Sequence, residues 1–210
     1  MRTGILTLWL LLPIGFGAYH FGPGQERLRL DDAGALLREA AERAARAERL
    51  AATDPAGARA DYALAQASIE EALLLLPEDA PAPRQRARLE LAKCQLNASQ
   101  LPQANASLAS LVDELAGDPA ADAALLAEAR SAYASSQYYM TWLVRLEGAG
   151  REEWEPRIET ARQTYKLLAE EADARGDAPA AAAHREDLEA SIRLARLDLA
   201  ELQGLPLPSQ

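Results

Sequence analysis

Few side chains in this sequence have the chemistry of a nucleophile, a general base or a metal ligand. The chain has two histidines, His20 and His184, and one cysteine, Cys94. That leaves little material for a zinc site and none for an internal disulfide or a CxxC redox motif. Glu186 and Asp187 follow His184, but we do not expect them to converge with it on one face. A Gly-rich phosphate loop, an HExxH helix and a GxSxG elbow are absent from the sequence. We therefore expect a protein that is not an enzyme and that holds no metal or cofactor.

Aromatic residues are concentrated between positions 133 and 154, although the whole chain is only 5% aromatic. The stretch carries Tyr133, Tyr138, Tyr139, Trp142 and Trp154. Helical spacing places Tyr138 and Trp142 with Arg145 on one side of a helix. Because Tyr, Trp and Arg dominate interface hot spots, we expect Tyr138, Trp142, Arg145 and Trp154 to be partner-binding residues. The alternative is that these side chains supply bulk to a core whose other helices are rich in alanine.

The balance of charge limits the partners. Lys and Arg number 22 and Asp and Glu number 32, which gives a net charge of −10. Nucleic-acid binding draws much of its affinity from the neutralisation of phosphates by basic residues. We therefore expect no nucleic-acid partner.

Residues 5–21 form an uncharged apolar segment behind a positively charged start, which is typical of a membrane-targeting signal. As a helix, this segment would cover about 25 Å, a little less than a hydrocarbon core of ~30 Å. Tyr19, His20 and Phe21 at its end resemble an interfacial aromatic collar. These features favour an uncleaved, single-pass anchor in the inner (cytoplasmic) membrane, with the body on the extracytoplasmic, periplasmic side. A signal peptide that is cleaved to release the body into the periplasm is the alternative.

The rest of the chain has the periodicity of helices. From Asp31 onward, apolar residues recur every three or four positions. This pattern, broken by Gly, Pro and Asp, predicts seven helices at about 32–52, 55–76, 83–98, 101–116, 119–147, 153–174 and 177–203. We expect an all-α fold of antiparallel helical hairpins. Its parts would be residues 1–24, in which Gly22-Pro23-Gly24 forms a hinge, a helical domain at 31–203, and an extended Leu/Pro tail at 204–210.

Two of the predicted hairpins carry a more specific pattern of small and large apolar residues. The first comprises Ala65, Ile69, Ala72, Leu73 and Pro77, and the second Leu91, Ala92, Leu101, Ala104, Leu108 and Leu111. In this pattern, residues at about 45–118 resemble two tetratricopeptide (TPR) repeats. The resemblance implies a short right-handed solenoid of stacked hairpins, preceded here by the N-terminal hydrophobic helix. It also implies a role in protein–protein contact without catalysis.

The same resemblance points to a groove. The first helix of each TPR pair lines the concave face, which implies that Arg86, Leu89, Lys93 and Asn97 point into it. Two cations and an amide there could hold a carboxylate or an acidic peptide segment. The alternative is a solvated face on which Glu90 neutralises one of the cations.

Together these features predict a non-enzymatic, membrane-tethered, TPR-like scaffold or adaptor. Its partners would be other envelope proteins, or their acidic or extended segments, and it would dock them or assist their assembly. A periplasmic or secreted module that encloses a small molecule between the helices at 119–147 and 177–202 is the alternative. A self-assembling structural protein is a third possibility.

Overall fold

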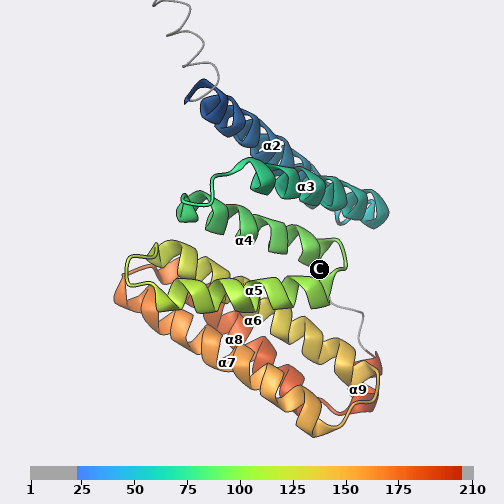
Figure 1. Ribbon diagram of the computed structural model, residues 1–210. Helices are drawn as coiled ribbons and strands as arrows, with labels where there is room; N and C mark the ends of the chain where they lie inside the picture. The colour runs from blue at the N-terminus through green and yellow to red at the C-terminus, as the bar shows by residue number, and fades with distance from the viewer. Residues whose placement is uncertain (1–22, 205–210) are drawn as a thin grey trace, which may run out of the picture.

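The computed structural model describes residues 23–204, and the regular elements in that range are helices (Figure 1). They are α2 (Pro23–Leu50), α3 (Pro55–Leu75), α4 (Pro81–Asn97), α5 (Leu101–Gly117), α6 (Ala123–Leu146), α7 (Arg151–Ala174), α8 (Ala178–Arg196) and α9 (Leu199–Gly204). The described chain is therefore all-α, as its periodicity predicts. The predicted apolar segment at 5–21 and the tail at 205–210 lie outside the described residues. Within residues 23–204, no helix is both long and apolar enough to cross a membrane.

Aspartate side chains and glycines mark the ends of several helices. Asp54, Asp122 and Asp177 precede α3, α6 and α8, and each carboxylate accepts a hydrogen bond from a backbone N–H group in the first turn. Such N-caps satisfy donors that the helix leaves unpaired. Gly148 and Gly176 follow α6 and α7 with φ of +82° and +74°, in the left-handed region that glycine adopts without strain. Local sequence thus explains where these hairpins turn.

From α2 to α8, each helix packs mainly against its neighbours in the chain, so these helices form a continuous stack, and α9 packs against α6 (Figure 1). Three clusters of buried apolar side chains hold the stack together. They join α2 with α3 and α4, α4 with α5 and α6, and α6 with α7, α8 and α9. Several residues of the TPR-like pattern are buried, namely Ala65, Ile69, Ala72, Ala92, Leu101, Ala104, Leu108 and Leu111.

The predicted starts of two helices are wrong. α2 already includes residues 23–31, ahead of the predicted start near Asp32, so Pro23 and Gly24 are helical where a hinge was predicted. α6 begins at Ala123 rather than near Asp118, because the Asp118 carboxylate accepts a hydrogen bond from the Ala120 N–H group and holds a turn.

The last predicted helix, at 177–203, is two helices, α8 and α9. Asp198 and Glu201 form a reciprocal cap between them. The Glu201 carboxylate accepts from the Asp198 N–H group at 3.0 Å, and the Asp198 carboxylate accepts from the Glu201 N–H group at 2.7 Å. This capping box starts a new helix and interrupts the apolar stripe. Leu199 lies four residues after Ala195 and three before Leu202, a spacing that predicts a core position, but as a result of this break it is 42% exposed.

An ion pair ties α2 to α3. Arg46 donates from its guanidinium to the carboxylate of Asp61, which is 6% exposed. The hydrogen bonds from Arg46 are the main reason why the pKa of Asp61 lies below its usual range. The pair therefore stabilises the hairpin only while Asp61 is ionised.

We expect Asp61→Asn to lower the free energy of unfolding near neutral pH and to have a progressively smaller effect below about pH 4. A carboxyl group whose pKa is depressed by folding stabilises the fold above its unfolded pKa. That contribution is lost as the pH falls through the folded pKa. Urea unfolding at neutral and acidic pH measures the difference, with Asp32→Asn, at an exposed position of α2, as the control. If the difference in free energy of unfolding between the wild-type chain and Asp61→Asn stayed the same in acid, this interpretation would be contradicted.

Candidate functional site

The cationic stripe predicted on α4 lies against α6 and is neutralised there. Arg86 donates to the carboxylate of Glu128, and Lys93 donates to Glu128 and, at 3.1 Å, to Glu90. The Asp122 carboxylate also lies near Arg86, with 3.9 Å between Asp122 Oδ2 and a guanidinium nitrogen of Arg86. Burial raises the pKa of Glu128, but hydrogen bonds from Lys93 and Arg86 outweigh burial and hold that pKa below its usual range. Both cations thus have carboxylate partners within the chain, which favours a solvated, internally paired face over an empty carboxylate-binding groove.

The other two residues of the predicted groove are Leu89, which is buried, and Asn97, which bonds to its own helix. Leu89 is 0% exposed and belongs to the cluster that joins α4, α5 and α6. Asn97 is partly buried, and its side-chain amide donates at 2.8 Å to the backbone carbonyl of Lys93 on its own helix. The predicted contact between Leu89 and a partner is therefore wrong, because side chains of α5 and α6 cover Leu89.

The aromatic side chains of α6 belong largely to the core. Trp142 is 5% exposed, and its indole N–H donates to the Tyr138 hydroxyl at 3.2 Å. Leu143 lies four residues after Tyr139 and three before Leu146, a spacing that predicts a core position, but it is 40% exposed. The buried face of α6 therefore contains Trp142 and Arg145, and Leu143 lies outside it. The predicted role of these two residues as exposed contacts for a partner is wrong, because α7, α8 and α9 cover them.

Arg145 is the polar centre of this cluster. It is 7% exposed and donates to the backbone carbonyl oxygens of Leu194 and Leu197 at the end of α8. Its guanidinium carbon lies 4.6 Å from the centroid of the Trp154 ring, within the range of a cation–π interaction. Burial lowers the pKa of Arg145. The guanidinium satisfies carbonyl groups that a helix end leaves unpaired, while Trp154 stays partly exposed.

The structure brings His184 closer to an acid than the sequence led us to expect. Asp187 Oδ2 lies 3.9 Å from His184 Nδ1, because residues three apart share a helix face. The His184 ring stacks on Tyr165 with 6.3 Å between centroids. Burial raises the pKa of Tyr165 and raises that of Cys94 to about 11, so neither is ionised near neutral pH. Among the described residues, no group of three His, Cys, Asp or Glu side chains could hold a metal ion.

An apolar cleft between α2 and α4 is a feature that the sequence did not lead us to expect. Its volume is about 350 Å³. Ala40, Ala41 and Ala44 line it on α2, Ala87 and Cys94 line it on α4, and Ile69 lines it from α3. Of these, Ala40, Ala87, Ile69 and Cys94 are buried. Arg86 and Glu90 supply charge at the α4 edge. Apart from Arg86 and Glu90, the side chains that line the cleft are apolar.

The sizes of the facing side chains explain why this cleft stays open while the next space along the stack is closed. Between α4 and α6, Leu89 and Leu125 are buried and fill the interface. Between α2 and α4 the facing residues include Ala41, Ala44 and Ala87, whose methyl groups fill less of the space between two helices. The small residues are a signal that the sequence contains, but the width of the cleft depends on how far apart α2 and α4 lie.

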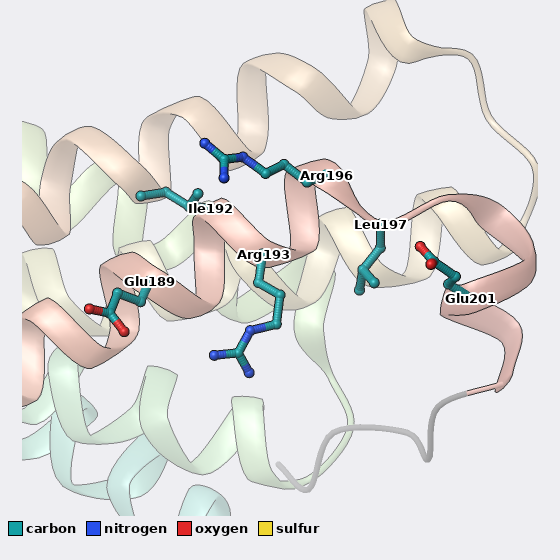
Figure 2. A pocket seen from close by; sticks show the side chains of 6 residues that line it. All are labelled: Glu189, Ile192, Arg193, Arg196, Leu197 and Glu201. Atoms are coloured by element: carbon teal, nitrogen blue, oxygen red, sulfur yellow. The ribbon is translucent and has the colours of Figure 1, made fainter.

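A second, more open hollow lies at the end of α8 (Figure 2). Its volume is about 420 Å³, and it is lined by Glu189, Ile192, Arg193, Arg196, Leu197 and Glu201. A neighbouring hollow of about 290 Å³ between α7 and α8 shares Ile192 and Arg196 with it and includes Trp154. Of the aromatic residues predicted to bind a partner, Trp154 therefore lies at an accessible surface.

The described part of the chain is thus an all-α protein, a stack of helices with hollows on its surface. No protein-family model matches the chain, and no curated protein or solved structure is significantly similar to it. The type of helical repeat is therefore not identified by comparison.

Proposed function

We propose that this chain is a non-enzymatic, membrane-tethered scaffold or adaptor of TPR-like architecture that docks other envelope proteins. The observation that carries the proposal is the apolar cleft between α2 and α4. Residues 5–21 would be the tether, in the inner membrane, with the helical body on the periplasmic side. Stacked helical hairpins favour such a role because they present extended surfaces to partners.

The chemistry of the cleft suits a protein segment with bulky apolar side chains. On the other side of α4, α6 shows what a complementary helix looks like. It places Leu125 in the interface and pairs Glu128 with Arg86 and Lys93. A partner helix with leucine-sized side chains would fill the alanine-lined cleft, and burial of apolar surface contributes about 25 cal/mol per Å².

A small-molecule site is the second candidate, because the cleft volume falls within the ~300–1,000 Å³ range of ligand pockets. Such a site would lie here and not between the helices at 119–147 and 177–202, because buried side chains, among them Trp142, Tyr165 and Leu194, pack between α6, α7 and α8. Thermal shift against a metabolite panel separates the two functions. A true ligand at ~100 times its dissociation constant adds about 2.7 kcal/mol to the free energy of unfolding.

Ala41→Trp tests the docking function, because Ala41 is an exposed residue that lines the cleft. A tryptophan there should fill the cleft and remove at least one protein that the wild-type chain captures from detergent-solubilised membranes. The control is Ala45→Trp, at an exposed alanine of α2 outside the cleft. A chain without the helical body sets the background. If both tryptophan variants recover the same proteins in equal amounts, the cleft is not the docking site.

A single cysteine at the mouth of the cleft gives a direct measure of occupancy. Cys94, the only cysteine of the chain, is buried and not ionised near neutral pH, so the probe is a double variant, Cys94→Ala with Ala41→Cys, which places one exposed thiol at the cleft. A captured partner, once purified, should slow the labelling of that thiol by a maleimide. Unchanged labelling in the presence of saturating partner would place that partner elsewhere on the surface.

A further inference from the structure

One face of α8 carries charges and an isoleucine that the rest of the fold does not cover. Glu189, Ile192, Arg193 and Arg196 line the hollow at the end of this helix. Because Ile192, Arg193 and Arg196 follow Glu189 by three, four and seven positions, the four residues share one helix face. Figure 2 shows Glu189 toward one end of the hollow and Arg196 toward the other, with Ile192 and Arg193 between them.

The charges on this face have no ion-pair partners within the described chain. Glu189, Arg193 and Arg196 are exposed, and none of them forms an ion pair in the part of the chain that the structure describes. By contrast, Arg185, one turn before Glu189, pairs with Asp173 on α7. A partner that satisfied this face would have to supply both a cation and a carboxylate.

The composition of the two hollows favours no partner of a single sign. Two glutamates and two arginines line the hollow at the end of α8. On the α7 side of the neighbouring hollow, Arg151 pairs with Glu155 and Arg162 pairs with Glu159. A strongly acidic or strongly basic segment would therefore meet as much repulsion as attraction, whereas a surface of mixed charge would not.

The order of the charges along α8 makes the face complementary to itself. The midpoint between Glu189 and Arg196 falls between Ile192 and Arg193. If a second copy of α8 lies antiparallel on this face, with a two-fold axis at that midpoint, Glu189 of each copy faces Arg196 of the other. Ile192 of each copy then meets the aliphatic stem of Arg193. A parallel arrangement would place like charges together.

We propose that two copies of this chain associate through α8 as an antiparallel dimer with two-fold symmetry. Ile192 lies at its centre, with an ion pair between Glu189 and Arg196 on each side. A two-fold dimer is the commonest closed assembly of identical chains, and it requires a self-complementary surface of this kind. Ile192 and Arg196 also line the neighbouring hollow with Trp154, which extends the apolar part of the surface toward α7. This surface lies at the far end of the stack from α2 (Figure 1), so dimerisation does not use the cleft between α2 and α4.

Sedimentation velocity of the full chain in neutral detergent tests the proposal. We expect the wild-type chain to dimerise, and Glu189→Arg or Arg196→Glu alone to raise the dissociation constant at least tenfold, because each change brings like charges face to face. The matched controls are Glu42→Arg and Arg38→Glu, at exposed positions of α2, which change the net charge by the same amounts. A wild-type chain that stays monomeric at hundreds of micromolar would overturn the proposal, and so would equal effects of the α8 and α2 variants.

Two exchanges of charge make the test specific to the antiparallel arrangement. The double variant Glu189→Arg with Arg196→Glu exchanges the two signs and should restore the wild-type dissociation constant. An equimolar mixture of the two single variants should form a heterodimer, because one copy then presents only cations and the other only carboxylates at these positions. If neither exchange restored association, the two residues would not face each other and the proposal would be wrong. Ala41→Trp should leave association unchanged, which separates this test from that of the cleft.

Discussion

Replacing Arg145 by alanine is expected to lower the free energy of unfolding by about 2–4 kcal/mol. The buried guanidinium makes hydrogen bonds to the carbonyl oxygens of Leu194 and Leu197 and packs on Trp154. Its removal leaves two carbonyl groups at the break between α8 and α9 without their partner and opens a void beneath the indole. Because both effects occur inside the core, water cannot fully compensate for them.

Urea unfolding measures this loss, and Arg151→Ala is the matched control. Arg151 is exposed, and its one ion pair among residues 23–204 is with Glu155, one turn away on α7, so its replacement should cost less than about 0.5 kcal/mol. The loss of stability in Arg145→Lys should lie between those of Arg145→Ala and Arg151→Ala. An ammonium group keeps the charge but cannot reproduce the planar, multiply donating geometry of a guanidinium. Equal urea midpoints for the two alanine variants would show that Arg145 does not hold the α8–α9 break.

Leu89→Ala is expected to lower the free energy of unfolding by about 2–5 kcal/mol. Leu89 is 0% exposed and packs in the cluster that contains Leu108, Leu111 and Leu125. Truncation removes buried apolar surface and leaves a cavity that helices on both sides cannot easily close. A residue that lined an open groove would instead show unchanged stability and weaker capture of a partner.

The control for this prediction is Leu74→Ala, at a leucine of α3 that is 86% exposed. We expect that change to stay within about 0.5 kcal/mol of wild type. Denaturant unfolding of the two variants side by side decides between a core and a groove position. If Leu89→Ala were as stable as Leu74→Ala, α6 would not cover α4 as the structure shows.

The helical fold and most helix positions could be predicted because their signals are local. Asp54 and Asp177 cap α3 and α8 at the predicted helix starts of about 55 and 177, and Gly176 follows α7 just after its predicted end at about 174. Asp198 and Glu201 have the spacing of a capping box, so the start of α9 was also readable. The regular apolar spacing across this point masked it, because periodicity alone does not report a change in helix direction.

The candidate sites depended on which helix lies beside which. Trp142 and Leu143 are adjacent in sequence, yet one is buried and the other exposed, because α7, α8 and α9 cover only one side of α6. Arg86 and Lys93 were recognised as a stripe, but their partner Glu128 is on a helix that sequence spacing could not place opposite them.

For this protein, the sequence by itself determined a helical chain, its hairpin turns and its stripes of small residues, since each depends on contacts within a few positions along the backbone. Tertiary structure alone decided which stripes became core and which became surface. The alanines of α2 and α4 line an open cleft and Leu89 is buried because helix separation is set by the bulk of side chains that meet from distant parts of the chain.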